Sequence, residues 1–257
     1  MMITEGSYIL IFVMDVDGTI CFNGQFIEDN LKREIKRIGE KHQIIFASAR
    51  PIRDLVPVVK DFGNKILIGG NGSIVSINEE IGVIQSIAHD VFLKLKELIV
   101  SNHLEYIIDG PFDYSAKVSP DNKIYRQLDP ERLAQNVKMD DITEPIKVIL
   151  LNLDDDMFEH ITKALAPYSA FLSINYHKRE NNIDITAKNI NKYTTLKQII
   201  HMASYVAYGN DINDYDLLKH AKQAYYVGGN KAEMPFANVE YIDRSALELI
   251  KSLKNIE

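Results

Sequence analysis

The sequence has a single cysteine, Cys21, and no tryptophan among its 257 residues. One cysteine cannot form a disulfide within the chain, and without a C-x-x-C pair the zinc ribbons and dithiol redox centres are excluded. A chain of this length buries an adequate core without cross-links. This cysteine usage is typical of a reducing compartment, so we expect the protein in the cytoplasm.

Long apolar runs and an excess of positive charge are also missing. The longest apolar run, residues 8–14, is far shorter than the ~20 residues that a membrane-spanning helix needs. Glu5 stands where a signal peptide carries positive charge. The 36 acidic and 29 basic residues give a net charge of −7, which argues against nucleic acid or an anionic membrane as the main partner. We therefore expect a small-molecule ligand.

Two regions, residues 1–77 and 186–257, alternate short apolar runs with segments of helical periodicity. Residues 8–14 form a continuous apolar run that ends at Asp15, as expected for a parallel strand buried on both faces. This alternation predicts an α/β fold with a Rossmann-like parallel-sheet core. The expected core strands are 8–14, 43–47, 65–68, 205–208 and 224–227, and the expected helices lie around 31–38, 55–62, 196–200 and 217, and from Ser245 onward.

The alternation is interrupted in the middle of the chain. Residues 74–77 and 83–87 flank an Asn78-Glu79-Glu80 turn and predict an antiparallel hairpin. We interpret residues 78–185 as an α+β domain inserted into the core. Its expected elements are strands at 104–108, 146–153, 170–174 and 183–185, with helices near 91–99, 131–138 and 157–165.

Two carboxylates, in Asp15-Val16-Asp17-Gly18-Thr19, directly follow the first expected strand. Open α/β folds bind their ligands at the carboxyl ends of parallel strands. There one carboxylate can attack a substrate, while its neighbour, on a turn that Gly18 permits, acts as acid and base. A turn with two solvated acids is the alternative. An EF-hand is excluded because the glycine comes too early for that calcium loop.

Polar residues also follow other expected elements. Ser48 and Arg50 come after the strand at 43–47, where a hydroxyl and backbone amides can bind a phosphate oxygen. Ser48 taken alone fits a helix N-cap equally well. Lys192 precedes a helix, and from there its charge can neutralise a phosphate, although most lysines at such positions are solvated.

A second polar cluster, Gly209-Asn210-Asp211-Ile212-Asn213-Asp214, follows the strand expected at 205–208. It brings oxygen donors to the sheet edge that carries Asp15. Such hard oxygen ligands suit Mg²⁺. A polar turn that caps the following helix is the alternative.

Together these segments resemble the four motifs of the haloacid dehalogenase superfamily in order and context. The segments are Asp15–Thr19, Ser48 in Ala47-Ser48-Ala49-Arg50, Lys192, and Gly209–Asp214. Asn71-Gly72 and Gly229-Asn230, with the large insertion between the second and third motifs, are similar to its Cof-type phosphatase branch. The resemblance implies a Rossmann-like core and a mobile α/β cap that closes over small phosphorylated metabolites.

Carried over residue by residue, the resemblance implies an Mg²⁺-dependent phosphatase with a covalent intermediate. Asp15 would be the nucleophile that forms an aspartyl-phosphate, and Asp17 the general acid and base. Ser48 and Lys192 would hold the transferring phosphoryl group. The residues expected at the phosphate are Gly18, Thr19, Ser48, Arg50, Lys192 and Asn213, and those expected at Mg²⁺ are Asp15, Asp17 through its carbonyl, Asn210 and Asp214.

The chain departs from the family pattern at Asn210, where an aspartate is usual. An amide oxygen can still bind the metal, and Asp211 is an alternative ligand. Lys188 is an alternative to Lys192, but the helix start at Thr194-Thr195-Leu196 favours Lys192. Two other functions stay open: a phosphomutase-type phosphotransferase, and a weakly catalytic protein that binds phosphate esters.

Overall fold

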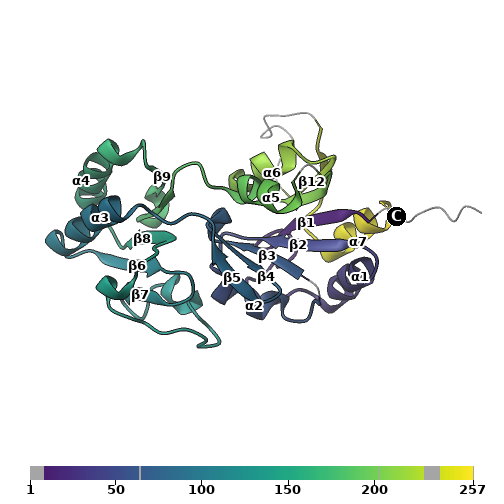
Figure 1. The fold of residues 1–257 in the computed structure, drawn as a ribbon, viewed down its shortest axis with the longest axis horizontal. Coiled ribbons are helices and arrows are strands. Elements are labelled where there is room, and N and C mark those ends of the chain that lie inside the picture. The colour runs from purple at the N-terminus through teal and green to yellow at the C-terminus, as the bar shows by residue number, and fades with distance from the viewer. Residues whose placement is uncertain (1–8, 64, 202, 229–237, 257) are drawn as a thin grey trace, which may run out of the picture.

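The structure is a computed structural model that describes residues 9–63, 65–201, 203–228 and 238–256. It contains two domains side by side, each built on its own sheet, with eight strands in the larger and five in the smaller (Figure 1). The first residue of the expected strand at 8–14 and the Gly229-Asn230 pair lie outside the described residues. Within the described ranges, no helix has the length and apolar composition needed to cross a membrane.

The eight-stranded sheet forms the core predicted from the alternating pattern. Its first six strands in sheet order are parallel, and β4 and β5 extend it as an antiparallel hairpin. β1 lies inside the sheet, paired with β11 and β2, and its side chains are buried on both faces. In order the strands are β13 (Glu240–Ile242), β12 (Gln223–Val227), β11 (Val206–Gly209), β1 (Ile11–Asp15), β2 (Gln43–Ala47), β3 (Lys65–Gly69), β4 (Ile74–Ile77) and β5 (Glu80–Val83).

Helices cover both faces of this sheet, as expected for a doubly wound fold (Figure 1). On one face Phe12 and Met14 pack against α1 (Asp29–Gly39), α2 (Ile52–Val59) and α7 (Ala246–Lys254). On the other, Val13 packs against α5 (Lys192–Ile200) and α6 (Tyr215–Lys219). The α/β core class predicted from the sequence is confirmed.

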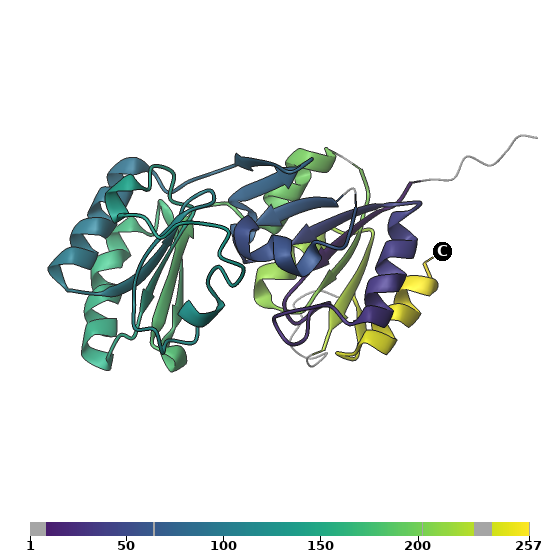
Figure 2. The same ribbon diagram turned by 90° about the horizontal axis from the view of Figure 1, so that it is seen from below.

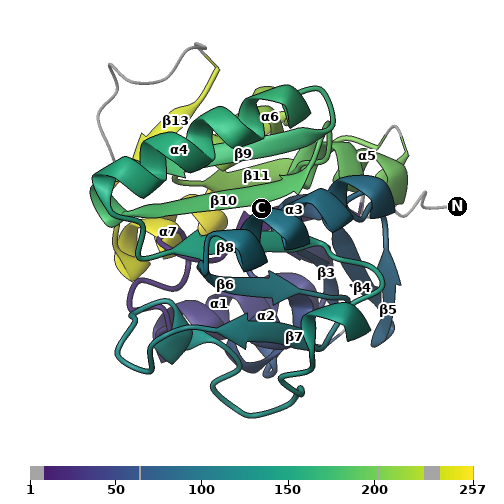
Figure 3. The same ribbon diagram turned by 90° about the vertical axis from the view of Figure 1, so that its left-hand side faces the viewer.

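The smaller domain is an antiparallel sheet covered on one face by two helices. Figure 3 shows α3 (His89–Ser101) and α4 (Asp155–Leu165) in front of this sheet, and Figure 2 shows its opposite face turned toward the core. In sheet order the strands are β7 (Tyr114–Lys117), β6 (Glu105–Asp109), β8 (Lys147–Leu151), β10 (Asn182–Ala187) and β9 (Leu172–His177). The chain therefore carries an inserted α+β domain, referred to below as the cap.

The boundaries of the cap differ from the predicted 78–185 by a few residues. The hairpin turn consists of Asn78 and Glu79, both with positive φ, so the second strand begins at Glu80 and not at the expected residue 83. That strand, β5, belongs to the core sheet. At the other end β10 continues to Ala187 in the cap sheet. The predicted boundaries split the β4–β5 hairpin and cut through β10, because strand pairing is not visible in local periodicity.

The helix expected at 131–138 is wrong, because this segment forms turns and extended backbone. The Asp129 carboxylate accepts hydrogen bonds from the backbone amides of Leu133 and Ala134, which replaces the first turn of a helix. The segment then pairs with Tyr114, whose amide donates to the carbonyl of Gln135. Strand β7, which it meets, is itself too short and polar to have been predicted.

Candidate active site

The candidate site lies at the carboxyl ends of the central strands. Asp15 is the last residue of β1 and lies opposite Ala47, so Ser48 follows at the same edge. β11 ends at Gly209, directly before the polar turn of the fourth motif. Three of the four predicted motifs therefore leave neighbouring parallel strands at one sheet edge, as open α/β folds require.

Lys192 completes this edge from the first turn of α5. Asn191 caps that helix by accepting from the Thr194 amide, while the Thr194 hydroxyl accepts from the Asn191 amide. These two hydrogen bonds fix the start of α5, from which Lys192 reaches the end of β1. Lys188, the alternative lysine, is exposed.

A buried cluster of three charges forms the centre of the site. The Lys192 Nζ atom lies 2.6 Å from Asp15 Oδ1 and 2.6 Å from Asp214 Oδ1. The Thr19 hydroxyl donates to Asp15 Oδ2 over 2.7 Å. The exposed fractions of Asp15, Lys192 and Asp214 are 4%, 1% and 0%, so water screens these charges little.

The cluster contains one more negative than positive charge, which changes the protonation of its members. Burial, and then repulsion from Asp214, raise the pKa of Asp15 from 3.8 to about 7, although Lys192 and Thr19 act in the opposite direction. Burial opposes the charged form of Lys192, yet the two carboxylates raise its pKa above the ordinary value. The ionised form of Asp15 would therefore be stabilised by additional positive charge.

Asp17 is bound by Arg50 through both of its carboxylate oxygens. The Arg50 Nε and Nη2 atoms donate over 2.7 and 2.6 Å, and the same guanidinium donates to the carbonyls of Gly24 and Asp54. The expected contact of Arg50 with a phosphate stays a prediction. Asp17 remains half-exposed, at 43% of its side chain.

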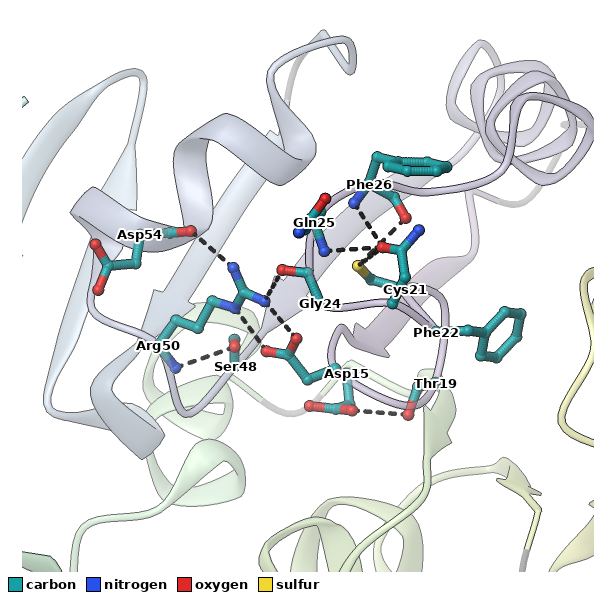
Figure 4. Close-up of polar contacts among 12 residues, drawn as sticks. Asp15, Thr19, Cys21, Phe22, Gly24, Gln25, Phe26, Ser48, Arg50 and Asp54 are labelled. Atoms are coloured by element: carbon teal, nitrogen blue, oxygen red, sulfur yellow. Dashed lines mark hydrogen bonds and ion pairs between the residues drawn. The ribbon is translucent and has the colours of Figure 1, made fainter. Parts of the chain in front are cut away.

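Ser48 and Asn213 lie at the edges of the cluster. The buried Ser48 hydroxyl accepts from the Arg50 amide over 3.1 Å, so it caps the turn that carries Arg50 (Figure 4). Asn213 donates to the Asn71 side chain over 3.3 Å, and its own Oδ1 is buried without a partner. Their expected contacts with a phosphate stay predictions.

The oxygen atoms needed for a metal ion are present next to Asp15. With its amide nitrogen turned toward them, Asn210 lies 3.0 Å from the Asp17 carbonyl, Asp15 Oδ2 and the Thr19 hydroxyl. In the opposite orientation its amide oxygen faces the same oxygen atoms, as a shared hard cation would require. Within the part of the chain that the structure describes, no group of three or more His, Cys, Asp or Glu side chains is arranged to hold a metal ion. A cation at this position would instead be bound by carboxylate, carbonyl and amide oxygens together, which is a donor set that fits Mg²⁺.

Asp214 holds the backbone of the turn that carries Asn210. Its Oδ2 accepts from the backbone amides of Asn210 and Asp211, while its Oδ1 accepts from Lys192. Both oxygens thus have protein donors, and Asp214 would have to exchange one of them to bind a metal directly. Asp211, the alternative ligand, is exposed and caps the Ile212 amide.

Gly18 allows the first motif and Asn210 to approach each other. Its φ is +81°, and a Cβ atom there would lie 2.3 Å from Asn210 Nδ2. Gly24 has a similar φ of +74°, but a Cβ atom there would be 3.7 Å from its nearest neighbour. We expect Gly24→Ala to lower the free energy of unfolding by about 1–2 kcal/mol through backbone strain alone. Gly18→Ala should lower it further because it also displaces Asn210.

Urea unfolding of both variants measures this difference. Equal losses for the two variants would show that the contact with Asn210 has no energetic consequence.

The haloacid dehalogenase-like hydrolases match this sequence over residues 12–238. The chain belongs to this family. The match covers the whole cap and most of both parts of the core, so the resemblance seen in the four motifs is confirmed. Comparison with curated protein sequences finds no significant match.

Solved structures show the same fold over nearly the whole length. A haloacid dehalogenase-like hydrolase from Bacteroides thetaiotaomicron has a TM-score of 0.83 at 16% identity, covering 97% of this chain and 100% of that one. A sugar phosphatase of subclass IIB of the superfamily has a TM-score of 0.73 at 16% identity, covering 96% and 98%. A second Bacteroides thetaiotaomicron protein, described among the phosphatases of the superfamily, has a TM-score of 0.73 at 17% identity, covering 99% and 97%.

Sequence reasoning missed a second cluster of buried charges, at the junction of core and cap. Arg53 and Asp54 of α2 and Asp109 of β6 are each less than a tenth exposed and are joined by ion pairs. No motif marks them. The one available signal was Asp109, which ends an apolar strand as Asp15 does.

Proposed function

We propose that this hydrolase is an Mg²⁺-dependent phosphatase that acts on small phosphorylated metabolites through an aspartyl-phosphate intermediate. The observation that carries the proposal is the buried Asp15 carboxylate at the end of β1, with Lys192 on one oxygen and Thr19 on the other. Asp17 lies two residues away on the same loop. This is the arrangement that nucleophilic phosphoryl transfer with a separate acid and base requires.

Asp15 attacks in the first step. One of its oxygens bonds to phosphorus, the bond from phosphorus to the ester oxygen breaks, and an aspartyl-phosphate and the substrate's alcohol result. Lys192 and Thr19 fix the orientation of the carboxylate. In the second step water attacks phosphorus, the bond to the Asp15 oxygen breaks, and inorganic phosphate leaves.

Asp17 makes the two proton transfers. It gives a proton to the leaving oxygen in the first step and takes one from the attacking water in the second. Because both of its oxygens accept from Arg50 in this structure, we expect Asp17 to separate from Arg50 in order to reach the substrate oxygen. Arg50 also binds the Gly24 carbonyl, so the loop after the first motif is linked to this step.

Mg²⁺ would be held by the Asp15 carboxylate, the Asp17 carbonyl and the Asn210 amide oxygen, and it would offset the repulsion between an anionic nucleophile and an anionic phosphate. Asp214 keeps the Asn210 backbone in place through its Oδ2. The raised pKa of Asp15 is consistent with a site that gains from additional positive charge.

The proposed substrate is a small metabolite such as a sugar phosphate. A cavity of about 190 Å³ lies between the loop after Ser48 and the cap sheet, with Arg50, Lys147 and Ile149 among its lining residues. Its mixed polar and apolar lining suits a small hydroxylated leaving group. The sugar phosphatase that shares this fold supports the same substrate class.

Steady-state hydrolysis of 4-nitrophenyl phosphate, with and without Mg²⁺, tests the proposal. We expect release of inorganic phosphate that depends on Mg²⁺. Phosphate delivered from a bisphosphorylated sugar to another sugar, with none released to water, would instead establish a phosphomutase. Saturable binding of phosphate esters without turnover would establish a binding protein, the alternative that Asn210 suggests.

Asn210 sets the charge of the proposed metal site. Asn210→Asp adds a carboxylate 3.0 Å from Asp15 Oδ2, so the site should bind Mg²⁺ more tightly. We expect the Mg²⁺ concentration for half-maximal activity to fall about tenfold, and Mg²⁺ to raise the melting temperature more than in the native protein. Asn213→Asp adds the same charge in the same turn beside Asn71 and is the matched control. Equal responses of the two variants would remove Asn210 from the metal site.

A further inference from the structure

The cavity between core and cap has one wall from each domain. Ala49, Arg50 and Asp54 line the core wall, and Asp109 and Ile149 line the cap wall. The width of this cavity therefore depends on how the cap is placed over the core. Side chains that join the two walls would set that width.

Arg53 binds a residue of each wall. On the core side its Nε and Nη2 atoms donate to the two oxygens of Asp54, over 2.9 and 3.0 Å. On the cap side its Nη2 donates to Asp109 Oδ1 over 2.8 Å, and its Nη1 donates to the Phe112 carbonyl over 2.9 Å. The guanidinium also lies 4.9 Å from the centre of the Tyr114 ring. A single side chain of α2 thus contacts the end of β6, the following loop and the start of β7.

The contact is buried and geometrically selective. Arg53 is 0% exposed and Asp109 2%, so the ion pair lies away from water. Apolar surfaces slide past each other with little change in energy, whereas a planar guanidinium satisfies its acceptors over a narrow range of positions. Buried ion pairs add little stability compared with apolar packing, but separation of the partners is strongly unfavourable. Such a pair suits a contact that fixes orientation.

The first turn of α2 is also linked, through Arg50, to Asp17, the proposed acid and base. Asp54 binds Arg53 through its carboxylate, and its backbone carbonyl accepts a hydrogen bond from Arg50 (Figure 4). Arg50 in turn donates to both carboxylate oxygens of Asp17. Asp54 Oδ1 also accepts from the Asp129 amide of the cap. In Figure 3 the cap strands β6 and β7 lie in front of α2. The first turn of α2 therefore contacts both the cap and Arg50, the residue that binds Asp17.

We propose that Arg53 is a positioning residue that fixes the cap over the candidate active site, by joining Asp54 of the core wall to Asp109 of the cap wall. Its effect on the reaction rests on the phosphatase function proposed above, whereas its effect on cap position does not. The exposed ion pair between Lys60 and Glu131 also joins core and cap, over 3.0 Å, and is a matched control because both partners are solvated.

Cap position is measured first, without reference to catalysis. Spin labels at Asp156→Cys on the cap and Lys254→Cys on the core, in a Cys21→Ser background, report the distance between domains by double electron–electron resonance. We expect Arg53→Met and Asp109→Asn to broaden the distance distribution and Lys60→Met to leave it unchanged. An unchanged distribution for both Arg53→Met and Asp109→Asn would overturn the inference, whether or not the protein is active.

Kinetics then separate positioning from a general structural role. For 4-nitrophenyl phosphate, which has the larger leaving group, we expect Arg53→Met to raise KM about five- to tenfold. For acetyl phosphate, with its smaller leaving group, the change should stay below twofold. Arg53→Lys, which keeps the charge but loses the fork, should lie between native and Arg53→Met. Equal losses of kcat for both substrates, with unchanged KM, would overturn the positioning role.

A double variant distinguishes loss of the contact from loss of the fold. Arg53→Met leaves buried carboxylates unpaired, so the double variant Arg53→Met/Asp109→Leu removes one charge of each sign. It should fold, show the broadened distances and retain the raised KM for 4-nitrophenyl phosphate. Absence of turnover in the native protein would contradict the proposed function alone, since the spin-label distances would still decide the placement of the cap.

Discussion

Asp15→Asn should lower the rate of 4-nitrophenyl phosphate hydrolysis at saturating Mg²⁺ by at least about a thousandfold, because an amide cannot form the covalent intermediate. The fold should be retained, since the amide is isosteric: its oxygen can still accept from Lys192, and its nitrogen can donate to the Thr19 hydroxyl oxygen. The buried cluster then becomes neutral, with Lys192 facing Asp214 alone. In the absence of Mg²⁺ we expect the free energy of unfolding near neutral pH to be equal to or greater than that of the native protein.

Two measurements check this expectation. Urea unfolding monitored by circular dichroism separates loss of chemistry from loss of fold. Mass spectrometry of acid-quenched native enzyme should find a phosphoryl group on the peptide that contains Asp15, and none in the variant. Retention of more than a tenth of the native rate by Asp15→Asn would falsify the assignment of the nucleophile.

Lys192→Met should be the most destabilising change in the site. It removes the one cation between Asp15 and Asp214, and an uncompensated buried charge costs about 3–5 kcal/mol. Activity should also fall, because the carboxylate loses the lysine that orients it. Lys188→Met is the matched control, since Lys188 lies four residues earlier and is exposed. We expect it to change the free energy of unfolding by less than about 0.5 kcal/mol.

The destabilisation by Lys192→Met should depend on pH. The pKa of Asp15 is raised to about 7 in the folded protein from 3.8, so between these values the folded state binds a proton that the unfolded chain has released. Its contribution to stability therefore decreases as pH rises through this window. Loss of Lys192 raises the pKa of Asp15 further and extends the decrease to higher pH.

Urea unfolding at pH 5 and pH 8, both without Mg²⁺, measures this dependence. The gap in stability between native protein and Lys192→Met should be wider at pH 8. A gap of the same size at both values would indicate that Lys192 acts through packing and not through its charge.

The sequence was informative wherever a feature depends on neighbouring residues. The buried strand that ends at Asp15, the Gly18 turn and the polar run after Gly209 are local patterns, and strands of this kind meet at one sheet edge in an α/β fold. These patterns predicted Asp15, Asp17, Ser48 and Asn210 at one edge of the sheet, and the family resemblance added Lys192. The structure brings Asp15, Lys192 and Asn210 together.

Reasoning from local pattern failed where distant segments compete for the same backbone groups. The helical periodicity at 131–138 was overridden by the Asp129 carboxylate and by pairing with Tyr114. The boundary expected at residue 78 missed β5, because only strand pairing shows to which sheet a short strand belongs.

The sequence by itself determined the class of fold, the presence of an inserted domain and the residues that gather at the carboxyl ends of the central strands. Only the tertiary structure decided which charges face each other: Arg50 binds Asp17, Asp214 shares Lys192 with Asp15, and Arg53 reaches the cap at Asp109. The physical reason is range. The residue patterns that predict strands and turns extend over a few residues, whereas the ion pair between Arg53 and Asp109 depends on how the cap packs against the core.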